Sequence, residues 1–311
     1  MATTHSTYRP ELTDAGLDAA EAVTAIDESG QTREGFIAAE RALTIYLNKR
    51  EIVTLMTLGT NPELLVLGWL KNQRLVNDIN DVKALQIDWE TESAAITTYN
   101  PIADLDNKLG RKTVTTGCGQ GTVFGGLMDD LDKITIPQVQ IRQSRIYDLL
   151  TTLNHHNEVY KRAGAVHGCA LCEDIQLGLF VEDVGRHNAV DAIAGHMWLN
   201  NIHGNNKLFY TTGRLTSEMV IKGAQMGIPV LLSRSGVTHM GLEVAQKVGV
   251  TLIARAKGRH FLVYSGADNI EFDAIPESSK PESSKEHHKS RKTMPVAETV
   301  TEKVNHAHCN D

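Results

Sequence analysis

Alternating apolar and polar residues begin near Arg41 and predict a β-hairpin. Apolar side chains stand at every second position from Leu43 to Leu47, the polar run Asn48–Arg50 interrupts them, and a largely apolar stretch resumes at residues 52–58. A period of two is typical of strands with one buried face. The polar interruption therefore predicts the turn between two paired strands.

A buried helix is expected directly after this hairpin. Asn61 suits the N-cap position and Pro62 suits the first helical position, where its missing N–H has no cost. The apolar residues 64–70 then supply the helix body. Further strand is expected within residues 80–100, and leucine and isoleucine side chains between 146 and 153 predict an amphipathic helix that runs to about residue 160.

The second half of the chain alternates strand and helix patterns regularly. Strands are expected over residues 177–181, 208–211, 228–232, 251–254 and 261–264. Helices follow the first three, with one apolar face formed by Val190, Ile193, Ala194 and Met197 and two further helices near residues 217–226 and 238–248. This alternation predicts an α/β fold with a parallel sheet and crossover helices.

Composition is typical of a soluble globular protein. The 311 residues are 41% hydrophobic and 22% charged, and the formal net charge of −7 gives no reason to expect nucleic-acid binding. No run reaches the roughly 18 apolar residues of a spanning helix, and the first 27 residues lack a secretory pattern, so we expect no membrane segment and a cytoplasmic location. In that compartment, four cysteines favour catalysis or metal binding over disulfides.

Changes in composition divide the chain into four expected parts. Residues 1–35 predict a flexible, loosely ordered arm, residues 36–137 an N-terminal lobe that includes the loop around Cys118, and residues 138–267 an α/β cofactor-binding lobe. Residues 268–311 contain the repeat Pro-Glu-Ser-Ser-Lys and almost no large apolar side chains, so they predict a disordered tail.

Three polar turns follow successive predicted strands: Glu182–Arg186, Thr212–Arg214 and Ser233–Gly236. Each contains an arginine and a glycine. In a parallel sheet all three turns would lie at the carboxyl edge, and each is expected to open a helix. Glycines, helix N-termini and guanidinium groups together predict an anion pocket.

A histidine and an aspartate stand four residues apart at the start of one predicted helix. His187 and Asp191 would therefore share a helix face, where the carboxylate could hold the imidazole in one tautomer. The pair could serve acid–base chemistry or ligand orientation, or it could be a structural surface pair.

Cysteines stand in two segments that could carry chemistry. Cys118 lies in a loop with three nearby glycines, which favours an accessible, nucleophilic thiol. His167, Cys169 and Cys172 have the spacing of zinc ligands, with Cys118 as a possible fourth. The same cysteines could instead form a redox dithiol or pack as small hydrophobic side chains in a helix.

The polar motif closely resembles the formate dehydrogenase accessory sulfurtransferases. The resemblance rests on Glu-Asp-Val-Gly-Arg-His-Asn-Ala-Val-Asp at 182–191, on Gly213, Arg214, Thr216, Glu218 and Met219, and on Ile-Pro-Val-Leu at 228–231. It extends from about Arg41 to Gly266. The ten-residue motif is far more specific than a lone glycine pattern.

This resemblance implies a fold, an activity and a set of partners. It implies a cytidine-deaminase-like α/β/α sandwich with a smaller N-terminal β-rich lobe, assembled as a homodimer. It also implies transfer of a persulfide sulfur from a cysteine desulfurase to the molybdenum or tungsten bis-guanine-dinucleotide cofactor of the formate dehydrogenase catalytic subunit. That cofactor is the acceptor, so no permanently bound cofactor or metal is expected.

The resemblance also assigns roles to individual residues. Cys118 occupies the position of the persulfide cysteine. The family's cofactor segment near the final strand corresponds to Phe261, Leu262, Val263, Tyr264, Ser265 and Gly266. The motif and its neighbours supply the other cofactor-binding candidates, which are His167, Asp183, Arg186, His187, Asn188, Asp191 and Arg214.

One departure from the family pattern matters. The family loop commonly carries a second cysteine where this chain has Gly121. We therefore expect Cys118 alone to carry the persulfide, with assistance from Cys169 or Cys172 on an adjoining helix.

Three rival functions are considered beside sulfur transfer. Deaminase chemistry requires a histidine-x-glutamate pair and a later Pro-Cys-x-x-Cys, and neither is present, so it is rejected. A binding protein stabilised by zinc through His167, Cys169 and Cys172 remains open. A chaperone that holds the cofactor and docks on formate dehydrogenase without transferring sulfur also remains open.

Overall fold

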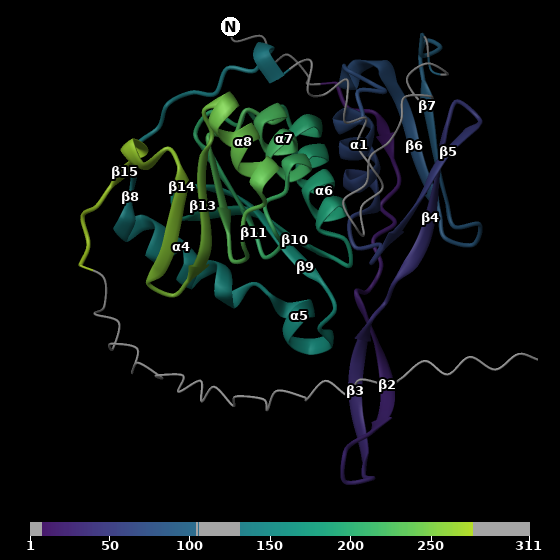
Figure 1. The fold of residues 1–311 in the computed structure, drawn as a ribbon. Coiled ribbons are helices and arrows are strands. Elements are labelled where there is room, and N and C mark those ends of the chain that lie inside the picture. The colour runs from purple at the N-terminus through teal and green to yellow at the C-terminus, as the bar shows by residue number, and fades with distance from the viewer. Residues whose placement is uncertain (1–7, 104, 106–130, 276–311) are drawn as a thin grey trace, which may run out of the picture. The chain divides into compact units, whose positions relative to one another are not determined.

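The computed structural model describes residues 8–103, 105 and 131–275 (Figure 1). The loop around Cys118 and residues 276–311 lie outside this range. Among the described residues, no helix combines the length and the hydropathy needed to traverse a lipid bilayer.

The N-terminal part builds a five-stranded sheet in the order β1-β6-β7-β4-β5. Its strands are β1 (Glu11–Leu12), β4 (Arg41–Leu47), β5 (Arg50–Thr57), β6 (Val82–Asp88) and β7 (Ser93–Thr98). The predicted hairpin is confirmed as β4 and β5, joined by Asn48 and Lys49 with φ of 50° and 71°. Positive φ at both central residues gives a two-residue turn whose twist matches that of the paired strands.

The expectation of a loosely ordered arm over residues 1–35 is wrong where the structure describes them. The strands β2 (Ala20–Ile26) and β3 (Thr32–Ala38) pair along their full length as a second hairpin. Most of their side chains are exposed or partly exposed, so no buried face imposes an alternating pattern on the sequence. A hydrophobic period in the sequence arises when one face of a strand is buried, and this hairpin buries little of either face.

The second sheet has six strands in the order β10-β9-β11-β12-β13-β14. Its strands are β9 (His167–Glu173), β10 (Gln176–Asp183), β11 (Lys207–Thr211), β12 (Val230–Ser233), β13 (Thr251–Lys257) and β14 (His260–Ser265). The α/β class is confirmed, and β11, β12 and β13 are parallel as expected. The sheet is mixed rather than wholly parallel, because β9 and β14 run antiparallel to their neighbours.

Helices cover both faces of this sheet (Figure 1). The helices α1 (Pro62–Asn72), α6 (Arg186–Leu199), α7 (Ser217–Gln225) and α8 (His239–Val248) contribute to one large apolar cluster, which also contains the inner side chains of the N-terminal sheet. On the other face, α4 (Gln143–His155) builds a smaller cluster. The helix expected up to residue 160 ends at His155, and a separate short helix, α5 (Glu158–Ala163), follows.

The expected tail begins later than residue 268. A short strand, β15 (Ile270–Glu271), pairs in parallel with β8 (Ile141–Arg142), and Ile270 is buried. The side chain and amide of Ser144 both donate to the carboxylate of Asp273. These contacts attach residues 268–273 to the fold.

The helices α1 and α6 approach so closely that glycine is required at both contact points. A Cβ atom on Gly68 would lie 1.7 Å from the carbonyl oxygen of Asp191, and one on Gly195 would lie 1.9 Å from that of Leu64. Because the obstructing atoms belong to the backbone, a side chain could be accommodated only if one helix moved. This contact joins the N-terminal sheet to the α/β sheet.

Replacing Gly68 by alanine (G68A) should lower the free energy of unfolding by about 3 kcal/mol or more, because the added methyl group meets backbone. Urea denaturation measures the change. Gly35→Ala is the matched control, since a Cβ atom there meets nothing within 4 Å. Equal stability of G68A and G35A would contradict the proposed helix contact.

Candidate functional site

The three arginine-containing turns do meet at the carboxyl edge of the second sheet. The strand β10 is antiparallel to β9, which is antiparallel to β11, so β10, β11 and β12 all point the same way. His167 begins β9 at this same edge, opposite Asp183 in the ladder. Although β9 runs in the opposite direction, its first residue lies at this edge, so β9 contributes His167 to it.

Only the first turn opens a helix directly. Gly185 is the N-cap residue of α6, whereas α7 and α8 begin after longer segments whose N-caps are Thr216 and Thr238. Those segments pair with each other instead, since the Leu215 amide donates to the Gly236 carbonyl and the Thr238 amide donates to the Leu215 carbonyl. The expectation of a helix N-terminus at each turn is thus wrong for two of the three.

Hydroxyl groups at the strand ends hold these turns in place. The Gly213 amide donates to Thr211 Oγ1 at 3.0 Å, and Ser233 Oγ donates to the Gly213 carbonyl at 2.6 Å. The Ser235 amide in turn donates to Ser233 Oγ at 2.9 Å. Such side-chain to backbone bonds fix a turn without a longer loop.

Arg186 lies buried among these turns. A Cβ atom on Gly213 would lie 2.9 Å from Arg186 Cδ, so glycine leaves the space through which the arginine side chain passes. Burial lowers the pKa of His167, and the positive charges of Arg186 and Arg214 lower it further. The His167 ring is therefore neutral near pH 7, and it begins β9 at the edge where Arg186 and Arg214 supply positive charge, an arrangement that favours an anionic ligand.

Asp183 and Asn188 connect the turn to the N-terminal sheet rather than facing an open site. The Asp183 carboxylate accepts hydrogen bonds from the Thr57 hydroxyl, the Asn188 amide and the backbone amides of Leu58 and Gly185, at 2.5–3.1 Å. Asn188 also donates to the Met56 carbonyl at 2.6 Å. Both side chains therefore set the position of the motif.

The expected pairing of His187 with Asp191 is wrong. His187 Nε2 lies 2.9 Å from Glu218 Oε2 on α7, and both side chains are buried. Asp191 instead accepts from Lys222 Nζ at 2.7 and 2.9 Å and from Asn72 Nδ2 at 2.6 Å. Because burial lowers the pKa of His187, its ring is held in the neutral form.

The zinc set of His167, Cys169 and Cys172 is also wrong. Both cysteines lie on strand β9 rather than on a helix, and residues three apart in a strand point to opposite faces. Cys169 packs in the larger apolar cluster and Cys172 in the smaller one. No group of three or more histidine, cysteine, aspartate or glutamate side chains in the described part of the chain could hold a metal ion.

Neither of these two cysteines is suited to assist sulfur transfer. Both are fully buried, and burial raises the pKa of each thiol to about 12. The reactive form of cysteine is the thiolate, so these thiols are inert near neutral pH. They pack as small hydrophobic side chains.

The segment Phe261–Gly266 does not converge with the arginine turns. It forms most of β14, which runs away from the carboxyl edge, and Gly266 lies beside Thr251 at the opposite edge. The assignment of this segment to cofactor binding stays a prediction. The turn before it does reach the edge, since Lys257 and Gly258 line a cavity of about 310 Å³ with Arg234 and Tyr210.

Sequence reasoning missed this turn and this cavity. Lys257 and Arg259 flank Gly258, so the turn repeats the basic and glycine-containing composition of the other three. That repetition was the available signal. The carboxyl edge thus carries basic side chains from four successive connections.

Known proteins resemble this chain over most of its length. The model of the FdhD/NarQ family matches residues 38–271. The chain is 28% identical over 242 residues to the sulfur carrier protein FdhD of Wolinella succinogenes, covering 78% of this chain and 84% of the relative. It is 29% identical over 239 residues to the protein of the same name from Bacillus subtilis, covering 76% and 91%.

A solved structure has the same fold. The crystal structure of a "putative formate dehydrogenase accessory protein" from Desulfotalea psychrophila superposes with a TM-score of 0.64 and 26% sequence identity. The alignment covers 81% of this chain and 98% of that one.

Binding of pyrophosphate at the carboxyl edge should raise the pKa of His167, because the added negative charge stabilises the imidazolium. Affinity for pyrophosphate should correspondingly increase as the pH falls through that pKa. Proton NMR titration of the imidazole, assigned with the H167N variant, measures both effects. Arg214→Ala should raise the pKa without ligand, whereas Arg33→Ala should not, because Arg33 pairs with Asp27 on the hairpin of β2 and β3. If the pKa of His167 stayed the same when pyrophosphate was added, this residue would not belong to the binding site.

Proposed function

Because the chain belongs to the FdhD/NarQ family, we propose that it is a cytoplasmic sulfurtransferase that activates formate dehydrogenase. It takes the outer sulfur of a cysteine desulfurase persulfide onto Cys118. It then passes that sulfur to the molybdenum or tungsten bis-guanine-dinucleotide cofactor, which is its substrate. The working form is a homodimer that docks on the formate dehydrogenase catalytic subunit.

The basic carboxyl edge is the observation that carries this proposal. The acceptor is a large anion with several phosphate groups, and Arg186, Arg214, Arg234 and Lys257 all stand on connections at one edge of the sheet. Guanidinium groups bind phosphate oxygens bidentately, and glycine turns let the ligand approach the backbone. The buried, neutral His187 lies one residue after Arg186 and fits an orienting role.

The two cysteines that the structure describes are unsuited to carry sulfur, which leaves Cys118 and Cys309, and the family resemblance favours Cys118. Sulfur uptake requires an accessible thiolate to attack the outer sulfur of the donor persulfide; a new S–S bond forms, the donor S–S bond breaks, and the donor thiolate leaves. Cys169 and Cys172 are buried with raised pKa values, so neither can make that attack. Cys118 lies outside the described residues, in the glycine-rich segment Thr115–Gly121.

A second candidate is a chaperone that holds the same cofactor without transferring sulfur. It would use the same basic edge, so the arginines do not distinguish the two functions. Transfer of a sulfur atom to the cofactor distinguishes them. The version of this candidate that depended on zinc is excluded by the opposite orientation of Cys169 and Cys172 on β9.

Replacing Cys118 by alanine should abolish sulfur uptake. Intact mass spectrometry after incubation with a cysteine desulfurase and L-cysteine should reveal one added sulfur atom on the wild type and none on C118A. The variants C169A and C172A should still gain it, provided that their melting temperatures show a folded chain. A C118A protein that still gained sulfur and activated formate dehydrogenase would refute the assignment.

Replacing Arg214 by alanine should separate acceptor binding from sulfur loading. Arg214 is exposed at the edge, and loss of a charged hydrogen bond of about 1.5–3 kcal/mol should weaken binding of GDP, used as a fragment of the acceptor, roughly tenfold or more. Sulfur uptake on Cys118 should be unchanged. Arg33→Ala removes the same charge elsewhere and should leave GDP affinity intact. Equal GDP affinity of R214A and R33A would contradict binding of the acceptor at the carboxyl edge.

A further inference from the structure

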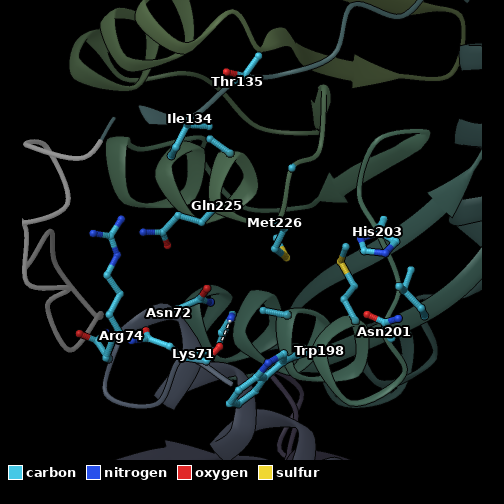
Figure 2. A pocket seen from close by; sticks show the side chains of 17 residues that line it. Lys71, Asn72, Arg74, Ile134, Thr135, Trp198, Asn201, His203, Gln225 and Met226 are labelled. Carbon is cyan, nitrogen blue, oxygen red and sulfur yellow. Dashed lines mark hydrogen bonds between the residues drawn. The ribbon is translucent and has the colours of Figure 1, made fainter. Parts of the chain in front are cut away.

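Figure 2 shows a second, larger cavity. It lies at the C-terminal ends of α6 and α7, whereas the arginine turns precede their N-terminal ends. It has a volume of about 940 Å³, which is within the usual range for small-molecule sites. The C-terminal ends of α1, α6 and α7 surround it, and residues 134–135 complete its wall. It shares no lining residue with the cavity beside Arg234 and Lys257.

The lining of this cavity carries positive charge and amide groups but no carboxylate. Lys71 and Arg74 are its cations, His203 is a further donor, and the amides come from Asn72, Gln73, Asn77, Asn201 and Gln225. Some carbonyl groups at the three helix ends are already occupied: those of Trp69, His196 and Lys222 accept hydrogen bonds from the backbone amides of Gln73, Asn200 and Met226 at 2.9–3.1 Å. Because the C-terminal end of a helix carries partial negative charge, an anion bound here would lie against the Lys71 and Arg74 side chains.

Gln225 is the feature that points to a ligand. Both its amide nitrogen and its amide oxygen are shielded from solvent and have no hydrogen-bond partner among the described residues, and the same holds for Nε2 of Gln73. Each buried group left in this state costs about 1–3 kcal/mol. Figure 2 shows the Gln225 amide facing the same open space as Arg74 and Asn72. A ligand that both donates to and accepts from this amide would remove the cost.

The Lys71 ammonium stands on another wall of the cavity. It donates to the Asn77 carbonyl at 2.6 Å and lies 5.0 Å from the centre of the Trp198 ring. Burial lowers the pKa of Lys71, and the charge of Asp78 offsets this only in part. An anionic group bound near Lys71 would stabilise the ammonium form.

We propose that this cavity binds an adenine mononucleotide, with Gln225 paired to the adenine edge and Lys71 and Arg74 near the phosphate. A glutamine amide matches adenine, because it can accept from the exocyclic amino group while donating to a ring nitrogen. Guanine can also pair with an amide through its O6 acceptor and N1–H donor, but its 2-amino group is a second, adjacent donor that adenine lacks, and the lining contains no carboxylate that could accept both. The site is independent of the sulfur-transfer proposal, since it lies at the other end of α6.

Isothermal titration calorimetry of the full chain with AMP tests the site. The wild type should bind AMP at one site, and GMP and inorganic phosphate should each bind there at least tenfold more weakly. Gln225→Leu should weaken AMP binding about tenfold or more, the effect of losing paired hydrogen bonds of roughly 1–3 kcal/mol. The melting temperature of Q225L without ligand should equal or exceed that of the wild type, since the change removes an unsatisfied buried amide.

Two controls separate this site from the carboxyl edge. Arg214→Ala should leave AMP binding unchanged. Binding of AMP should also quench tryptophan fluorescence in the wild type and in Trp89→Phe, but to a smaller extent in Trp198→Phe. The proposal is overturned if GMP or phosphate alone binds as tightly as AMP, if a folded Q225L binds AMP normally, or if R214A abolishes AMP binding. None of these results bears on the proposal that Cys118 takes up sulfur.

Discussion

The close approach of α1 to α6 at Gly68 and Gly195 is the constraint on which the rest of the structure depends. Each glycine contacts the backbone of the other helix, so the distance between the two helix axes is fixed at this point. The helix α1 follows directly from the N-terminal sheet, and α6 carries the polar motif at its start. The contact therefore fixes the motif relative to the end of β5, where Thr57 donates to Asp183.

Buried polar contacts also hold these helices together. Unlike apolar contacts, they carry the free-energy cost of removing charged groups from water. Asp191 and Lys222 are both almost completely buried, and Asn72 of α1 donates to the same carboxylate. Removing one member of such a pair leaves an uncompensated charge and typically costs about 3–5 kcal/mol, although an apolar replacement of the whole pair can be neutral. The group therefore specifies the arrangement of α1, α6 and α7 more than it adds stability.

The helix α6 has different chemistry at its two ends. Its first turn holds Arg186 and His187 among the basic connections of the carboxyl edge, where burial and neighbouring positive charge lower the pKa of His167. Its last turn contributes Met197 and Trp198 to the amide-lined cavity. The apolar side chains between them form part of the main core, so one helix separates two polar sites by its own length.

The sequence by itself determined the elements that have one buried face and the residues that follow them. The alternation at 43–58, the leucines at 146–153 and the apolar runs before each polar turn all report burial, so the strands, helices and shared carboxyl edge could be predicted. The resemblance of the 182–191 motif indicated the family. The hairpin at residues 20–38 was missed because neither of its faces is buried.

Only the tertiary structure decided which polar side chains meet. His187 and Asp191 share a helix, yet their partners, Glu218 and Lys222, both come from α7. His167, Cys169 and Cys172 have ligand spacing, yet a strand directs the two thiols into different cores. Spacing along a chain predicts a shared face only once the type of element is known, and contacts between elements depend on how whole helices and strands pack.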